Sequence, residues 1–214
     1  MTDDRRILRR RLRCARRALT PAQQKKASLE LLRQLAQHPV FRRSQHVAFY
    51  LANDGEIDPG PLMALARKRG KHCYLPIVTG WPADRMHFQR ITPNQRWTKN
   101  RFNIWEPQAD RSLQAPAWRL SLILMPLVGF DPNGNRLGMG GGFYDRSLAF
   151  RRRRKRWLGP TLLGLAHHCQ KAESIPAEPW DIPVDGIVTD RERLLLAPDQ
   201  RGLSSTVSDA SRSK

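Results

Sequence analysis

Cysteine is scarce in this chain, which has three such residues in 214, far apart at Cys14, Cys73 and Cys169. An odd and sparse set without a Cys-x-x-Cys pair is not the pattern of a disulfide framework or of a structural zinc site. We therefore expect free thiols, which are typical of a reducing compartment, and a cytoplasmic protein.

Long apolar runs are also missing. No stretch approaches the about 18 consecutive apolar residues of a membrane span, so we expect none. The N-terminus is rich in arginine, but charged residues and glutamines continue through residue 26, and no apolar segment of a secretory signal follows. For 214 residues, a single domain with a sizeable core is the default expectation.

Acidic residues are the third shortage. The chain has 19 Asp and Glu against 38 Lys and Arg, which gives a formal net charge of +19. The arginines gather in the first 17 residues and in the run 151–156. Such an excess indicates a polyanionic partner, whether nucleic acid, a nucleotide or a polyglutamylated small molecule. A solvated basic surface explains many of these arginines equally well.

Helical and extended patterns alternate along the chain. In residues 5–19, Leu8, Leu12, Ala15 and Leu19 form one apolar stripe on a helix that is otherwise basic. Thr20-Pro21 can cap a second helix that runs to about residue 37. A third helix is predicted from residue 59 to near residue 70. Short apolar runs predict strands at residues 46–51, 73–78, 86–91, 120–128, 162–166 and 186–188.

This alternation predicts an α/β fold, with a single three-layer domain in which helices flank a largely parallel central sheet. We expect the domain to span residues 1–198. Residues 199–214 are rich in Ser, Asp and Arg without apolar periodicity, which predicts a disordered tail.

The most informative segment is GFDPNGNRLGMGGGFYDR, residues 129–146. It follows the most apolar strand and precedes a helical segment near Tyr144. Glycines in such a loop let backbone N–H groups converge on phosphate oxygens, and a helix N-terminus adds partial positive charge. The alternative is an ordinary long connection. Four glycines within residues 138–142 cost entropy on ordering, which favours a functional loop.

Three familiar loops do not fit this segment. It has no lysine, which a Walker A loop requires. Phe143 stands where the dinucleotide fingerprint would need its last glycine. Asp131, Asn133 and Asn135 begin like a calcium loop, but Arg136 replaces the required glycine and no bidentate glutamate follows.

At this loop the sequence resembles the 5-formyltetrahydrofolate cyclo-ligase family, also called methenyltetrahydrofolate synthetases. The resemblance covers about residues 5–193. The motifs that carry it are RRILR, AFYLANDGEI, FNIWEP, PLVGFD, GNRLGMGGGFYDR and DIPVDGIVTD, in this order.

The resemblance implies a set of site residues. Arg5, Arg9 and Arg136 would act on the ATP phosphates as catalytic groups, and the family pattern often has lysine at the first position. Asp145 and Asp181 would bind Mg²⁺, whereas the role of the nearby Asp185 is left open. The ATP-binding loop would add Leu137, Gly138, Met139, Gly140, Gly141, Gly142, Phe143 and Tyr144, and the folate site Leu51, Glu56 and Phe102.

The resemblance also implies the reaction. The formyl oxygen of 5-formyltetrahydrofolate would attack the γ-phosphate of ATP, and N10 would close the ring as phosphate departs. The products would be 5,10-methenyltetrahydrofolate, ADP and phosphate. Phosphoryl transfer of this kind asks the protein mainly for alignment and charge stabilisation. We expect a monomer.

Two rival interpretations remain open. The charge alone would fit a nucleic-acid-binding protein, although no RNA or DNA module signature appears and aromatics do not interleave with the basic runs. Weak, non-specific nucleic-acid binding could accompany the ligase activity. Another nucleotide-dependent transferase could use the same loop. Without the resemblance, Glu56 would be an exposed loop acid, Phe102 a core aromatic and Asp181 a turn residue.

Overall fold

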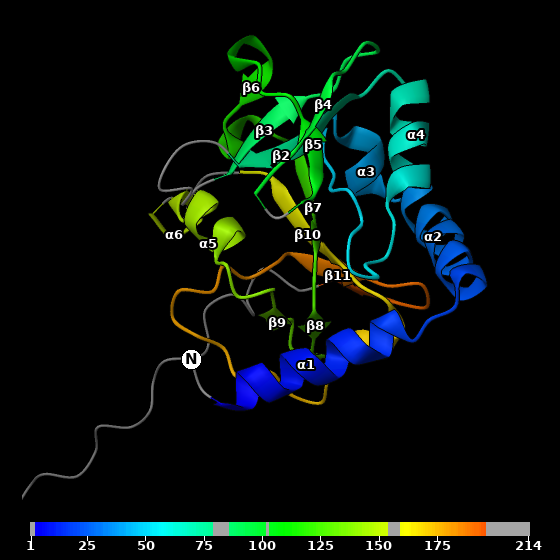
Figure 1. Ribbon diagram of the computed structural model, residues 1–214, viewed down its shortest axis with the longest axis vertical. Helices are drawn as coiled ribbons and strands as arrows, with labels where there is room; N and C mark the ends of the chain where they lie inside the picture. Colours follow the sequence, from blue (N-terminus) through cyan, green and yellow to red (C-terminus); the bar gives the residue numbers. More distant parts are fainter. Residues whose placement is uncertain (1–2, 79–85, 102, 154–158, 196–214) are drawn as a thin grey trace, which may run out of the picture.

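The computed structural model describes residues 3–78, 86–101, 103–153 and 159–195 of the chain (Figure 1). Phe102 and the tail predicted for residues 199–214 lie outside these ranges. The longer helices agree with the sequence prediction: Thr20 caps the second of them, and Gln23 completes a capping box. The α-helices are α1 (Asp3–Arg17), α2 (Pro21–Ala36), α3 (Pro39–Arg43), α4 (Gly60–Lys68), α5 (Phe143–Ser147) and α6 (Phe150–Arg153).

The described residues form an eight-stranded sheet in the order β12-β11-β10-β7-β1-β2-β3-β6. All neighbours from β11 to β2 are parallel, whereas β12, β3 and β6 are antiparallel additions at the edges. The strands are β1 (His46–Ala48), β2 (His72–Val78), β3 (Met86–Arg90), β6 (Gln114–Ala115), β7 (Leu122–Pro126), β10 (Thr161–Leu165), β11 (Gly186–Val188) and β12 (Arg193–Leu195).

Two small hairpins lie outside this sheet. One pairs β4 (Trp97–Lys99) with β5 (Trp105–Pro107), and the other pairs β8 (Gly129–Phe130) with β9 (Arg136–Leu137). Neither was predicted from the sequence. Strands β8 and β9 have only two residues each, and β4 is exposed along its length, so neither hairpin has an apolar run that could be recognised.

Helices cover both faces of the sheet, which confirms the predicted three-layer α/β fold. Successive strand residues point to opposite faces, so Leu122 and Leu124 pack with α2, α3 and α4. Ile123 and Met125 pack on the other face, with residues of α5 and of the C-terminal segments. Figure 1 shows α2, α3 and α4 on one side of the sheet and α5 and α6 on the other.

Helix α1 lies across the carboxyl ends of the central strands, and it buries an unexpected face. The predicted apolar stripe does face the protein: Leu12 is buried, Leu8 packs against the same cluster, and Ala15 and Leu19 are partly buried. The other buried positions of α1 are Arg5, Arg9 and Arg16. Arginines on a buried helix face need partners, and those partners come from the loops at this edge of the sheet.

Asp131 explains why the segment that begins like a calcium loop is structural. Its fully buried carboxylate accepts hydrogen bonds from the amides of Asn133 at 3.0 Å and Asn135 at 2.9 Å. It also accepts from the side chain of Asn135 and from the amide of Ile175, each at 2.9 Å. The carboxylate thus closes the turn between β8 and β9 and fixes it to the segment around Ile175.

We predict that Asp131→Ala lowers the free energy of unfolding by about 2–4 kcal/mol, because it leaves buried amide donors without acceptors. Urea denaturation of both proteins measures this loss. Asp110→Ala is the matched control, since Asp110 accepts from the amide and hydroxyl of Ser112 at the surface. A loss as small for Asp131 as for Asp110 would contradict the structural role.

Candidate active site

The glycine segment leaves the β8–β9 hairpin and enters α5. Gly140 has a φ of +99° and Gly142 a φ of +64°, a region that side-chain-bearing residues rarely adopt. The backbone therefore requires glycine at these two positions. Helix α5 begins at Phe143, close to the predicted residue, but has only five residues. Its macrodipole is short, so an anion here depends mainly on loop amides and arginines.

The glycine segment forms one wall of a cavity of about 590 Å³ at the carboxyl ends of the central strands. Most of the predicted site residues line it: Arg5, Arg9, Leu51, Glu56, Arg136, Gly138, Met139, Gly140, Gly141, Gly142, Phe143, Tyr144, Asp145 and Asp181. Leu137 is fully buried and does not line the cavity. Phe102 falls outside the described residues.

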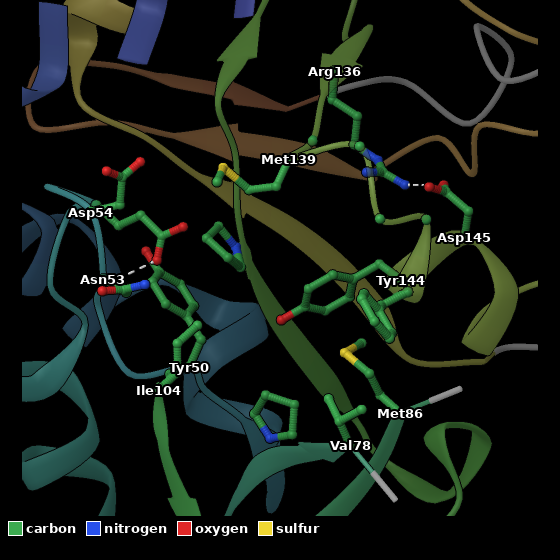
Figure 2. Close-up of a pocket in the computed structure, with 18 of the residues that line it drawn as sticks. Tyr50, Asn53, Asp54, Val78, Met86, Ile104, Arg136, Met139, Tyr144 and Asp145 are labelled. Carbon is green, nitrogen blue, oxygen red and sulfur yellow. Dashed lines mark hydrogen bonds and ion pairs between the residues drawn. The ribbon is translucent and has the colours of Figure 1, made fainter. Parts of the chain in front are cut away.

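One end of the cavity holds interleaved arginines and carboxylates. Arg5 donates to Oδ2 of Asp181 at 2.9 Å and to the carbonyl of Pro176 at 3.1 Å. Arg136 pairs with Asp145, as Figure 2 shows, and its Nε donates to the carbonyl of Ile182 at 2.9 Å. Two of the three predicted phosphate-binding arginines, Arg5 and Arg136, thus pair with the two predicted metal-binding aspartates.

Arg9 lies between this cluster and the glycine loop. Its Nε donates to the carbonyl of Gly138 at 2.8 Å, and its guanidinium lies 3.7 Å from the position that a Cβ would take at Gly140. Burial and the neighbouring Arg5 lower the pKa of Arg9 from its ordinary value. An anion bound beside both arginines would relieve this repulsion.

The positions of Asp145 and Asp181 can be compared with the ligands that Mg²⁺ requires. The amide of Ile182 donates to Oδ1 of Asp145 at 3.0 Å, which brings the residue after Asp181 against Asp145. Within the described ranges, no group of three or more His, Cys, Asp or Glu side chains could hold a metal. Two carboxylates still fit Mg²⁺, which usually takes one or two carboxylates together with waters and substrate phosphates.

Asp185 lies elsewhere. Its carboxylate accepts from Arg151 at 2.9 and 3.1 Å and from the amide of Leu162 at 2.8 Å. It is not among the residues that line the cavity. Of the three aspartates considered for the metal, only Asp145 and Asp181 reach the cavity.

The other end of the cavity combines an apolar lining with the largely buried carboxyl group of Glu56. Burial raises the pKa of Glu56 to about 7, against the opposing effect of Arg16. The amide of Asn53 donates to Oε2 of Glu56 at 3.2 Å. Figure 2 shows Tyr144 between this end and the Arg136–Asp145 pair. The apolar lining consists of Leu51, Leu75, Pro76, Val78, Met86, Ile104, Trp105 and Pro126.

Several residues at the cavity were missed by the sequence prediction. Tyr50 is buried there and donates its hydroxyl to the carbonyl of Ile57 at 2.6 Å. Glu106 accepts from the amide of Val78 and from Asn100, at 3.3 and 3.0 Å. The sequence carried no recognisable signal for these residues, and the contact between Val78 and Glu106 joins positions 28 residues apart.

We predict that Gly140→Ala weakens nucleotide affinity at least about tenfold, because a Cβ at this φ strains the loop backbone by about 1–2 kcal/mol or displaces it. Gly70→Ala is the matched control: Gly70 has a φ of +71° at the end of α4, with open space around its Cβ position. Calorimetric titration with a nucleotide compares them. Equal nucleotide affinity in both variants would show that the loop shape is irrelevant to binding.

A parallel sheet with a cavity at its carboxyl ends, lined by a glycine-rich loop and arginines, defines a class of α/β protein that binds anionic ligands at this edge. None of the described helices combines the length and apolar character needed to cross a membrane.

Comparisons with known proteins narrow this class. The model of the 5-formyltetrahydrofolate cyclo-ligase family matches residues 1–190. The 5-formyltetrahydrofolate cyclo-ligase of Escherichia coli is 39% identical over 178 residues, which cover 83% of this chain and 96% of that protein. For the cyclo-ligase of Haemophilus influenzae the identity is 34%, with 87% and 98% covered.

A solved structure of a methenyltetrahydrofolate synthetase has a similar fold. The 5,10-methenyltetrahydrofolate synthetase of Aquifex aeolicus superposes with a TM-score of 0.75 at 30% identity, covering 96% of this chain and 97% of that one. The chain belongs to the 5-formyltetrahydrofolate cyclo-ligase family.

Proposed function

We propose that this protein catalyses the ATP-dependent closure of 5-formyltetrahydrofolate to 5,10-methenyltetrahydrofolate, with release of ADP and phosphate. The observation that carries the proposal is a single cavity with two unlike ends. A cationic end formed by the glycine loop and three arginines adjoins an apolar end that holds the carboxyl group of Glu56, which is only 11% exposed. Membership of the cyclo-ligase family supports the same reaction.

The triphosphate binds at the cationic end. Arg5, Arg9 and Arg136 face phosphate oxygens there, and backbone amides of residues 138–142 supply further donors. Asp145 and Asp181 would hold Mg²⁺, which would neutralise charge that develops during phosphoryl transfer. The arginines now paired with these carboxylates are then free to turn toward the phosphates.

The reduced pterin binds at the apolar end. Its ring system would lie against the aliphatic side chains and Trp105, and Phe102 is proposed to join this lining. Glu56 accepts hydrogen bonds from the amide and amino N–H groups of the pterin edge. A carboxylate is suited to two parallel N–H donors, and a buried one discriminates against ligands that lack them.

Tyr144 and Met139 lie between the two ends, where the formyl group and the γ-phosphate would meet. The formyl oxygen forms a bond to the γ-phosphorus while the bond to ADP breaks. N10 of the folate then adds to the activated carbon and gives up its proton to the phosphate, and that carbon releases the oxygen as inorganic phosphate. The protein aligns these atoms and stabilises the transferred charge, and this step requires no acid–base pair.

The direct test is the absorbance of methenyltetrahydrofolate formed from 5-formyltetrahydrofolate, ATP and Mg²⁺, with ATP omitted as the control. We expect one ADP for each ring closed. ADP release without ring closure would favour the rival nucleotide-dependent transferase.

Four expectations from the sequence stay predictions: a monomeric state, a cytoplasmic location, a preference for polyglutamylated folate and weak nucleic-acid binding.

A further inference from the structure

Arg16 is the largest side chain that the fold buries completely, and its contacts reach three separate segments. Its Nε donates to the carbonyl of Asp54, and its Nη2 donates to Oδ2 of the same residue, both at 2.8 Å. Its Nη1 donates to the carbonyl of Leu127, which follows β7, at 3.3 Å. Helix α1 is thereby fixed to the loop of residues 53–56 and to the carboxyl end of the central strand.

The same guanidinium lies beside one residue of each proposed substrate site. Its Nη2 lies 3.8 Å from Oε1 of Glu56, the proposed pterin acceptor, and 3.8 Å from the sulfur of Met139 in the glycine loop. The backbone is equally close, since a Cβ at Gly55 would lie 3.3 Å from the carbonyl oxygen of Arg16. No other side chain in the described part of the chain is shown bridging these two loops.

Two neighbouring arginines share only part of this arrangement. Arg13 and Arg17 also pair with Asp54, but their side chains are 32% and 52% exposed, whereas that of Arg16 is 0% exposed. Neither is shown donating to Leu127 or Met139. Three cations on one carboxylate are more than its charge requires, so the position of Arg16 points to a different task.

We infer that Arg16 is a positioning residue of the active site: it holds the loop of residues 53–56 against the glycine loop and presents Glu56 to the pterin as a carboxylate. The inference rests on the proposed role of Glu56. It adds a residue that touches neither substrate and that acts through the acceptor.

The electrostatics of the loop agree with this task. Burial alone would raise the pKa of Asp54, but its hydrogen bonds to Arg13, Arg17 and Arg16 lower it to about 2, so Asp54 stays ionised. Glu56 faces a different balance. Burial raises its pKa to about 7, and Arg16 is the largest influence in the opposite direction.

The other groups around Glu56 do less to hold its charge. Arg13 and the amide of Asn53 favour the ionised form, whereas Asp54 disfavours it. Tyr50 and Tyr144 also face Glu56, and burial raises the pKa of both hydroxyls, which therefore stay neutral. Without Arg16, the carboxyl group would remain protonated to a higher pH and would present a donor where the pterin needs an acceptor.

The test is the pH dependence of 5-formyltetrahydrofolate affinity in Arg16→Met, measured by calorimetric titration from about pH 5.5 to 9. We expect the midpoint of the affinity profile to move up by about one pH unit or more relative to the unchanged protein. Arg17→Met is the matched control, because it removes one cation from Asp54 at the surface, and it should keep the original midpoint. An unshifted midpoint in folded Arg16→Met would overturn the inference.

Arg16→Lys keeps the test decisive if the methionine variant does not fold. Lysine retains the charge near Glu56 but cannot donate to Asp54 and Leu127 with the same fork. We expect an unchanged midpoint with folate affinity at least about fivefold weaker, and full affinity in this variant would refute the positioning role. Glu56→Gln separates the two hypotheses: if it leaves the affinity and its pH profile unchanged, the proposed role of Glu56 fails first.

Discussion

Arg136→Met is expected to lower kcat/KM for methenyltetrahydrofolate formation by about a thousandfold. A buried cation that meets a transferred phosphoryl group contributes differentially to the transition state, and losses of about 10²–10⁵ are typical for such donors. Arg136 is buried and pairs with Asp145 beside the glycine loop. Its replacement also leaves Asp145 with an uncompensated charge, so ATP affinity should fall as well.

The matched control for this experiment is Arg151→Met. Arg151 forms a comparable pair with Asp185, but neither residue lines the cavity. Both variants should unfold at a lower urea concentration than the protein without substitutions. Each variant leaves a partly buried carboxylate without its arginine partner. Steady-state kinetics should separate them. If Arg151→Met loses as much kcat/KM as Arg136→Met, the loss reports general destabilisation and not phosphate contact.

Glu56→Gln is expected to weaken 5-formyltetrahydrofolate binding by about a hundredfold at pH 8, while ATP affinity changes little. The amide offers one neutral acceptor and a donor that opposes the pterin N–H groups, and mismatched buried donors are costly. Calorimetric titration with each substrate measures the two affinities separately. The side chain keeps its size, so the cavity shape is preserved.

The ionisation of Glu56 predicts how folate affinity and the stability of the fold each change with pH. Burial raises the pKa of Glu56 to about 7, so the free protein holds this proton below that pH. If the pterin needs the carboxylate, folate affinity rises with pH up to about 7 and then levels off. Stability changes in the opposite direction: the folded state binds the extra proton between the unfolded pKa and about 7, so this group destabilises the fold as pH rises through that window.

A Glu106 variant tests whether Glu56 is the pterin acceptor. It is a second carboxylate at the cavity, but its Oε2 already accepts from Val78 and Asn100. If Glu106→Gln removed the pH-dependent affinity and Glu56→Gln did not, the pterin acceptor would have to be moved to the β4–β5 hairpin.

The long elements of the fold were predictable from the sequence, and the reasons are visible in particular residues. The run from Leu120 to Val128 is apolar on both faces because β7 is covered by helices on both sides. Thr20-Pro21 marked the start of α2 by its capping chemistry. Short hairpins and the antiparallel edge strand β12 left no such pattern, because β8 and β9 have only two residues each and β4 and β12 are largely exposed.

The site was predictable only where its chemistry is local. The glycines at residues 138–142 and the i, i+4 pair of Arg5 and Arg9 can be read along one segment. Arg16 could not be assigned in this way, although it continues the same helix face, since a helical pattern does not reveal which arginines are buried. Its partners at Asp54 and Leu127 are 38 and 111 residues away. Such contacts are set by the packing of α1 on the sheet.

In the proposed function, the glycine loop and its arginines hold a nucleoside triphosphate next to a pterin site. Calorimetric titration of the full chain with a non-hydrolysable ATP analogue and Mg²⁺ tests it most directly. We predict one site per chain with a dissociation constant between about 1 μM and 1 mM, weakened in both Gly140→Ala and Arg136→Met. No measurable binding of the nucleotide and Mg²⁺ by the folded protein would contradict this assignment. Nucleotide affinity as high in Gly140→Ala and Arg136→Met as in the protein without substitutions would contradict it too.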